Sequence, residues 1–386
     1  MNCEFHLHLY GCFTPEILYE QGGRLSDIPR WAWFAREYEA AWGKAPTWYW
    51  GVENGLEILK SECTLSHPTS FAQFQTVFNL SIALFPAVPE DPFPATLALQ
   101  CVRDQGVQYA ELRMVIPAFF SYSQAQIFLC MLSRAFFSAC SENFHPRLVI
   151  SLPHGPMTLL SQQYEWVREA MTQDPVVAQM LVALDFCGDE EQYDPREKQA
   201  FFRKSHADNR ATSYPLRFYY HVGECFSQLG MEAALCRVLQ VHELGVHRLS
   251  HASVLGIPPR AILHSEPEAE ILRLAALQRQ ILARLKEDGA VIESCPRANW
   301  ILSGISRFED HPLPHLLRSG VHVVLSSDDP GIFRTGYEEE RIFCREKLGV
   351  TEREMEMLDQ HAEHVLAASI AGDPRRSLRS LGDVTM

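Results

Sequence analysis

The chain has 386 residues, of which 47% are hydrophobic and 21% charged, and its formal net charge is −14. The composition is that of an ordinary globular chain, and the acidic balance disfavours a nucleic-acid partner, because such partners are held by Lys and Arg. The N-terminus lacks the cationic start of a signal peptide, and no apolar run approaches the ~18–20 residues of a membrane span. We therefore expect a cytoplasmic protein without a membrane partner.

Short apolar or β-branched segments alternate with longer segments of helical character along the whole chain. This alternation is typical of a parallel α/β architecture. Several short segments end in polar or ionisable residues, which is where a (β/α)8 barrel carries its reactive groups. We therefore predict one (β/α)8 TIM barrel domain over residues 1–386, with strands at 3–9, 107–115, 147–152, 181–186, 216–221, 246–250, 290–294 and 321–326.

The stretch between the first two predicted strands is much longer than one crossover requires, and it holds five of the seven tryptophans. We interpret residues 24–100 as a helical insertion that covers the barrel mouth and excludes water. Ordinary aromatic packing or a subunit contact explains the same composition equally well. From residue 338 onward the pattern indicates closing helices, and we expect residues 375–386 to fray.

The first predicted strand carries His6 and His8. Residues two apart on a strand point to the same face, so both imidazoles can reach one metal ion while Leu7 faces the packing layer. Gly11 permits a sharp turn just after the strand. A pair of surface or core histidines is the alternative.

Two later strand ends supply further ligands. His221 ends the fifth predicted strand, and Asp328 and Asp329 end the last one. Adjacent carboxylates repel unless a cation or several donors stabilise them, although a helix cap and a core histidine explain the same residues. Together, His6, His8, His221 and Asp328 form a mixed nitrogen and oxygen set suited to one Zn²⁺ with room for water. Zinc lowers the pKa of its bound water to about 7, which favours hydrolysis.

Seven short segments extend this pattern in chain order, namely HLHLYG, ELR, DFCGDE, HVGE, HRLSH, CPRAN and SSDDP. From residue 6 to about residue 335 they resemble the adenosine deaminase family of the amidohydrolase superfamily. The resemblance implies a (β/α)8 barrel that hydrolytically removes the 6-amino group of a purine and releases ammonia. It also implies that the four candidate ligands bind the zinc ion of that family.

The resemblance further implies the roles of individual residues. Glu224 corresponds to the carboxyl group that protonates ring nitrogen N1, a role that requires a raised pKa. His251 corresponds to the histidine that contacts the attacking water as a base or an electrostatic orienter. Asp329 corresponds to the carboxyl group facing N7, and Gly188 to the backbone N–H that meets N3. Apart from the resemblance, the position of His154 beyond the third predicted strand indicates either a residue that lines the pocket or one that caps a loop.

The chain departs from the family pattern at a few positions. Adenosine-acting members commonly carry an Asp that accepts a hydrogen bond from the sugar hydroxyl where this chain has Tyr10, which predicts a changed 5′ environment. Ser250 and Ala252 replace the glycines that usually flank His251. Arg297 could attract a carboxylate or phosphate near the mouth, although we favour a solvated side chain.

The leading hypothesis is a zinc-dependent deaminase, with one Zn²⁺ per chain, that acts on a small 6-aminopurine, namely adenosine or a related nucleoside. Free adenine, a 5′-modified adenosine and an N6-substituted adenosine are alternatives within this class. Another alternative is a metallohydrolase for an amide, lactone or phosphoester, but no lysine stands at a predicted strand end to hold a second metal. A metal-containing binding module without turnover is a third alternative. The sequence does not indicate which oligomeric state the protein adopts.

Overall fold

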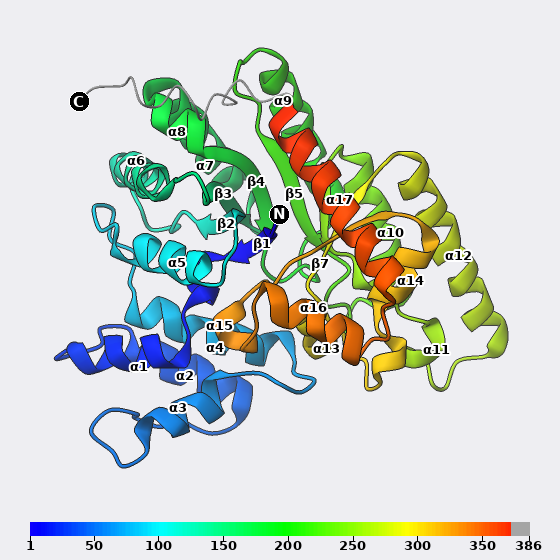
Figure 1. The fold of residues 1–386 in the computed structure, drawn as a ribbon, viewed down its shortest axis with the longest axis horizontal. Coiled ribbons are helices and arrows are strands. Elements are labelled where there is room, and N and C mark those ends of the chain that lie inside the picture. The colour runs from blue at the N-terminus through cyan, green and yellow to red at the C-terminus, as the bar shows by residue number, and fades with distance from the viewer. Residues whose placement is uncertain (372–386) are drawn as a thin grey trace.

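The computed structural model describes residues 1–371, so the predicted fraying of residues 375–386 lies outside the described part. Eight parallel strands form one sheet in the order β1 to β8, with helices between them, as in a (β/α)8 barrel (Figure 1). The strands are β1 (Cys3–His8), β2 (Tyr109–Val115), β3 (His145–Pro153), β4 (Leu181–Cys187), β5 (Arg217–Val222), β6 (Arg248–His251), β7 (Val291–Ser294) and β8 (His322–Leu325).

The predicted strands are confirmed, and each observed strand begins and ends within two residues of its predicted bounds. The strands are readable in the sequence because parallel strands buried on both faces form nearly continuous apolar segments. The exceptions to this apolar pattern include the charged residues Glu111, Arg113 and Asp185 on β2 and β4, which are buried inside the barrel.

The barrel closes between β1 and β8. A bridge pairs Leu7 with Asp328, and two backbone hydrogen bonds of 3.0 Å join His8 N–H to Asp328 O and Asp328 N–H to His6 O. Three of the four candidate ligands therefore belong to the one backbone junction that joins the first strand to the end of the last.

The helices and short 3₁₀ turns follow the strands in alternation. They are η1 (Leu9–Cys12), α1 (Pro15–Arg24), α2 (Trp31–Trp42), α3 (Gly55–Cys63), α4 (Phe71–Leu84), α5 (Phe93–Asp104), α6 (Tyr122–Ala139), α7 (Met157–Gln173), α8 (Pro175–Met180), η2 (Pro195–Lys198), α9 (Gln199–Arg210), α10 (Met231–Glu243), η3 (Ser253–Leu255), α11 (Pro259–Ile262), α12 (Glu268–Glu287), α13 (Pro296–Leu302), η4 (Phe308–Asp310), α14 (Pro312–Ser319), α15 (Pro330–Phe333), α16 (Tyr337–Glu346) and α17 (Glu352–Ala371).

Five helices, α1 to α5, occupy the long connection between β1 and β2, as the tryptophan-rich composition predicted. Helices α1 to α4 gather at one side of the molecule, beyond the end of β1 (blue, Figure 1). Trp31, Trp48 and Trp50 pack against one another, with ring centroids 4.9–5.7 Å apart. Trp33 instead lines a cavity that also contacts His8. Aromatic packing therefore accounts for these three tryptophans, whereas Trp33 faces the strand ends.

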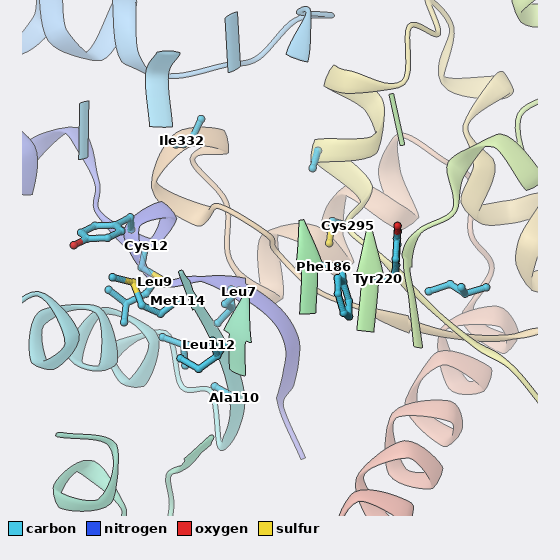
Figure 2. Packing of buried hydrophobic residues seen from close by; sticks show 14 of the residues in the cluster. Leu7, Leu9, Cys12, Ala110, Leu112, Met114, Phe186, Tyr220, Cys295 and Ile332 are labelled. Atoms are coloured by element: carbon cyan, nitrogen blue, oxygen red, sulfur yellow. The ribbon is translucent and has the colours of Figure 1, made fainter. Parts of the chain in front are cut away.

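The face of β1 opposite its histidines packs in the apolar layer, as the alternation predicted. Leu7 is 1% exposed and lies opposite Leu112 in the strand register. Figure 2 shows these two side chains beside each other, with Ala110 and Met114 on the same strand as Leu112. Among residues 1–371, no helix combines the length and apolar character that crossing a bilayer requires.

Candidate active site

The four candidate ligands converge on one point inside the barrel. The Nε2 atoms of His6, His8 and His221 lie 3.1–3.3 Å from one another. Asp328 Oδ1 lies 3.3 Å from His6 Nε2 and 3.4 Å from His8 Nε2. Residues more than 300 positions apart thus present three imidazole nitrogens and a carboxylate oxygen to the same small volume.

These distances fit a tetrahedral metal ion. Zinc bonds of about 2.0–2.1 Å in tetrahedral geometry place neighbouring ligand atoms roughly 3.3 Å apart. Burial lowers the pKa of both His6 and His8 well below its usual value, so the imidazoles are neutral and able to act as ligands. Burial raises the pKa of Asp328 to about 6, a cost that a bound cation relieves. The residues present therefore fit a divalent ion such as Zn²⁺.

Two buried carboxylates orient the ligand imidazoles. Glu293 on β7 contacts His6 Nδ1 at 2.9 Å, and Asp185 on β4 contacts His221 Nδ1 at 3.1 Å. Each contact holds one ring nitrogen and leaves Nε2 free for the metal point. Burial would raise the pKa of Asp185, but the His221 ring and the Arg113 guanidinium outweigh it and hold that pKa well below its usual value. Sequence reasoning missed both carboxylates, although Asp185 opens the DFCGDE segment.

A buried charge network supports these carboxylates. Arg113 contacts both Glu293 and Asp185, whereas Arg248 on β6 contacts both Glu111 and Glu293. Glu111 and Arg113 are two residues apart on β2, but each pairs with a different partner across the barrel. The network fixes the charge around the ligands without contributing to the metal point itself.

Glu224 and His251 form the next layer of the site. Glu224 Oε1 lies 3.4 Å from His251 Nδ1, and this oxygen has no hydrogen-bond partner among the described residues. Burial, then the charges of Asp328 and Glu190, raise the pKa of Glu224 well above its usual value. Burial lowers the pKa of His251 well below its usual value. Burial therefore favours the neutral form of both groups, and in that form Glu224 carries a proton that it can donate.

Asn299 on α13 fixes the tautomer of His251, and sequence reasoning missed it although it ends the CPRAN segment. Its Oδ1 accepts a hydrogen bond from the Cys295 N–H at 3.1 Å, which leaves its Nδ2 facing His251 Nδ1 at 3.0 Å. Since an amide nitrogen only donates, Nδ1 accepts and the imidazole proton sits on Nε2.

Asp329 is buried with both carboxyl oxygens unpartnered among the described residues. Burial and the charges of Asp328 and Glu224 raise its pKa well above its usual value, which favours a protonated carboxyl group that can donate. A Cβ at Gly11 would lie 1.7 Å from Asp329 Oδ1. Gly11 was expected for turn geometry, but it has no positive φ, and its missing side chain instead makes room for this carboxyl group.

Glu190 holds the loop that carries Glu224. Its carboxylate accepts hydrogen bonds from three successive backbone N–H groups, those of Gly223, Glu224 and Cys225, at 2.5, 2.7 and 2.8 Å. Such a fixed loop presents the Glu224 side chain in one position. The sequence motif DFCGDE contained this glutamate, but its partners lie on another strand end and were not predictable from spacing.

The remaining predicted residues lie on two sides of the metal point. His154 follows β3 and donates its backbone N–H to Cys187 O at 2.7 Å, beside Gly188, whose φ is +99°. Both ring nitrogens of His154 are buried without a partner among the described residues. Tyr10 lies in η1 and lines the same cavity of about 290 Å³ as His8. The structure therefore brings all ten predicted residues to the strand ends.

The backbone around the site is strained. His251, Ala252 and Asp328 have φ values of +64°, +46° and +62°, a region that residues other than glycine rarely adopt. This conformation explains why a glycine suits the position after His251, where this chain has Ala252. Ser250, on the other side, uses its hydroxyl to contact Glu293 at 2.7 Å.

Known proteins resemble this chain in sequence and in fold. An adenine deaminase from Sinorhizobium medicae is 33% identical over 96 residues, which are 25% of this chain and 29% of the relative, so the match spans under a third of that relative. A zinc-bound amidohydrolase from Burkholderia ambifaria has a TM-score of 0.60 at 16% identity, covering 97% of this chain and 91% of that chain. The Arabidopsis N6-mAMP deaminase has a TM-score of 0.60 at 17% identity, covering 94% and 91%.

The family assignment follows from a longer match. The sequence profile described as adenosine deaminase matches residues 53–382, which is most of the chain. The matched range begins after β1, yet the structure shows that His6 and His8 on that strand join His221 and Asp328 at one point. The chain therefore belongs to the adenosine deaminase family.

Proposed function

We propose that the protein is a zinc-dependent hydrolase, with one Zn²⁺ per chain, that deaminates a 6-aminopurine such as adenosine or a related nucleoside. One observation carries this proposal: a four-ligand metal point lies beside two buried carboxyl groups, Glu224 and Asp329, that have unpartnered oxygens. A buried polar group without a hydrogen-bond partner lowers the stability of the folded protein, so a ligand that hydrogen-bonds to these oxygens would bind favourably. A purine ring, with nitrogens on two edges, is such a ligand.

His6, His8, His221 and Asp328 would hold the ion, which supplies a water of lowered pKa and polarises the reacting centre. His251, whose Nε2 carries the ring proton, donates to the attacking water and so orients it. The proton that remains on the added hydroxyl passes to the departing amino group. Glu224, neutral because it is buried, delivers a proton to ring nitrogen N1 as C6 becomes tetrahedral. Asp329 donates to N7 and the Gly188 N–H to N3, so the ring is held on both edges while ammonia leaves. His154, beside Gly188, closes this wall of the pocket.

Free adenine is a second candidate substrate. The partial sequence match to an adenine deaminase supports it, and Tyr10 in place of the sugar-binding Asp supports a changed or absent sugar. The N6-mAMP deaminase of similar fold adds N6-substituted substrates to the range that needs testing.

The test is to purify the protein, measure its metal by elemental analysis, and follow ammonia release from adenine, adenosine and N6-methylated analogues. We expect one zinc per chain and turnover of at least one aminopurine. A protein that binds a stoichiometric metal and yet deaminates none of the panel would contradict the proposal and favour a binding module or another metallohydrolase.

A further inference from the structure

A cavity of about 290 Å³ connects the metal point to the helices that follow β1. Its inner end is lined by His8, Arg113 and Ser151, and its outer end by Arg30 and Phe119. The walls between are largely apolar, formed by side chains of α2, α4 and the end of β2. The candidate metal ligand His8 lines its inner end, so this cavity adjoins the reacting centre. Its volume is near the lower limit of ligand pockets.

The lining contains no aspartate or glutamate, although the chain has 48 acidic residues and a net charge of −14. It does contain two arginines. Arg113 forms ion pairs with Glu293 and Asp185, although its Nη1 has no hydrogen-bond partner among the described residues, whereas Arg30 has no carboxylate within 4.0 Å among those residues. The guanidinium of Arg30 lies over the ring of Phe119 instead, 5.2 Å from its centroid. Arg30 is half-buried at the outer end of the cavity, so its guanidinium is free to pair with an anionic group of a ligand that extends from the metal point.

Two further donors face the same space. Tyr10 is 7% exposed, and its hydroxyl makes no hydrogen bond to any described residue. Asn79 is 8% exposed; its Oδ1 accepts from Gln75, and its Nδ2 is left without an acceptor among residues 1–371. Neither atom is among the fully buried unpartnered ones, so each reaches the open space of the cavity, where an acceptor atom of a ligand can meet it. The guanidinium, the hydroxyl and the amide together suit a group with several acceptor oxygens.

Arg297, the arginine that the sequence singled out as a possible anion site, does not serve here. Its Nε lies 3.7 Å from the buried Glu340, and its backbone N–H donates to the same carboxylate at 3.1 Å. The sequence predicted anion attraction or a solvated side chain for Arg297, and it did not predict this ion pair with Glu340. Among the described residues that line the cavity, Arg30 is the cation without a carboxylate partner.

We propose that this cavity takes the sugar-side substituent of the substrate and that the substituent ends in an anion, so that the preferred substrate is an aminopurine nucleoside 5′-monophosphate. Arg30 binds the phosphate, and Tyr10 and Asn79 donate to its oxygens. This inference rests on the proposed function and specifies its substrate. It also gives a reason for Tyr10, since an aspartate at that position would repel a phosphate.

The experiment compares kcat/KM for adenine, adenosine and AMP in the wild type, Arg30→Met, Arg30→Lys and Arg36→Met. Arg36 is the matched control, because it is exposed on α2, the helix that begins directly after Arg30, and pairs with Glu37 outside the cavity. Calorimetry with IMP and inosine measures the same preference in binding, without turnover. We expect the wild type to prefer AMP over adenosine at least ten-fold and IMP over inosine similarly.

Arg30→Met should reduce both preferences roughly 10- to 100-fold, the worth of a hydrogen bond to a charged group. Arg30→Lys should retain part of them, and Arg36→Met should keep the wild-type ratio. Deamination of adenine or adenosine without any preference for AMP would overturn this inference alone, as would an Arg30→Met variant that loses activity equally toward all three substrates. Failure to deaminate any aminopurine would instead overturn the proposed function.

Discussion

The two halves of the site differ in how their polar atoms are satisfied. The metal half comprises the four candidate ligands, and buried carboxylates contact its imidazoles on the side away from the metal point. Glu293 contacts His6, Asp185 contacts His221, and Arg113 joins the two carboxylates. On the substrate half, Glu224, Asp329 and His154 leave buried atoms without partners among the described residues. The metal half also has such atoms, but they lie on the supporting residues Arg113, Arg248 and Glu293 and not on the ligand imidazoles. The difference teaches that the chain itself orients the candidate metal ligands, whereas on the other half it leaves buried polar atoms open to a bound molecule.

The largest expected effect comes from the substrate half. Glu224→Gln keeps the size of the side chain but removes its transferable proton. We expect kcat/KM to fall by at least the ~10²–10⁴-fold typical of general acid catalysis, with the metal content unchanged. Ammonia release and elemental analysis on the same sample measure both. Glu232→Gln, at an exposed glutamate on α10, is the control, and near-normal turnover of Glu224→Gln would refute the role of this residue.

The next prediction concerns the metal half. Asp185→Asn removes the charge that orients His221 and partly neutralises Arg113. Outer carboxylates of this kind typically contribute about 10–100-fold to metal affinity. We expect a loss of that size in a chelator competition assay, accompanied by a lower thermal midpoint. Asp288→Asn, at an exposed carboxylate, should leave the metal affinity unchanged. An unchanged metal affinity in Asp185→Asn would show that the contact with His221 does not support metal binding.

Glu190→Gln tests the link between the halves, because Glu190 fixes the loop between His221 and Glu224. An amide group replaces one acceptor oxygen with a donor that faces backbone N–H groups. We expect the free energy of unfolding to fall by about 1–3 kcal/mol and kcat to fall up to roughly 10²-fold, with metal affinity retained. Urea unfolding, kinetics and metal titration separate these effects.

Glu191→Gln is the matched control, since Glu191 accepts similar backbone hydrogen bonds from Gln228 and Leu229. It should lower stability without lowering kcat. If Glu190→Gln lost stability alone, its carboxylate would be structural and would not position Glu224.

The smallest effect is expected from Ala252→Gly, which relieves backbone strain beside His251. A non-glycine residue in the left-handed region costs about 1–2 kcal/mol, and the entropy of glycine offsets about 0.5–1 kcal/mol of that. We expect unfolding to become harder by at most about 1 kcal/mol and kcat to change less than three-fold or so. Destabilisation in urea would show that the neighbouring contacts, and not φ, dominate at this position.

Much of the architecture was predictable from the sequence. The eight strands are short apolar segments, and their polar ends mark the strand ends at which the site lies. His6 and His8 share a face because side chains alternate along a strand. The five helices between β1 and β2 were likewise predicted as an insertion. Local patterns carry this information, because burial on both faces of a strand constrains each residue type in turn.

The supporting residues were not predictable. Asp185, Glu190, Glu293 and Asn299 each act on a partner between 33 and 287 positions away. The free state of Arg30 and the pairing of Arg297 with Glu340 also depend on which carboxylates fold nearby. Residue type and spacing carry no record of such neighbours.

The sequence by itself determined the strand positions, the alternation that pairs His6 with His8, and the ordered motifs that identify the family. Tertiary structure alone decided that β1 closes against the end of β8, which places Asp328 beside both histidines. It also decided which buried polar groups have hydrogen-bond partners and which do not. The physical reason is that strand periodicity is a local property of the chain, whereas desolvation and charge depend on every element that packs around a side chain.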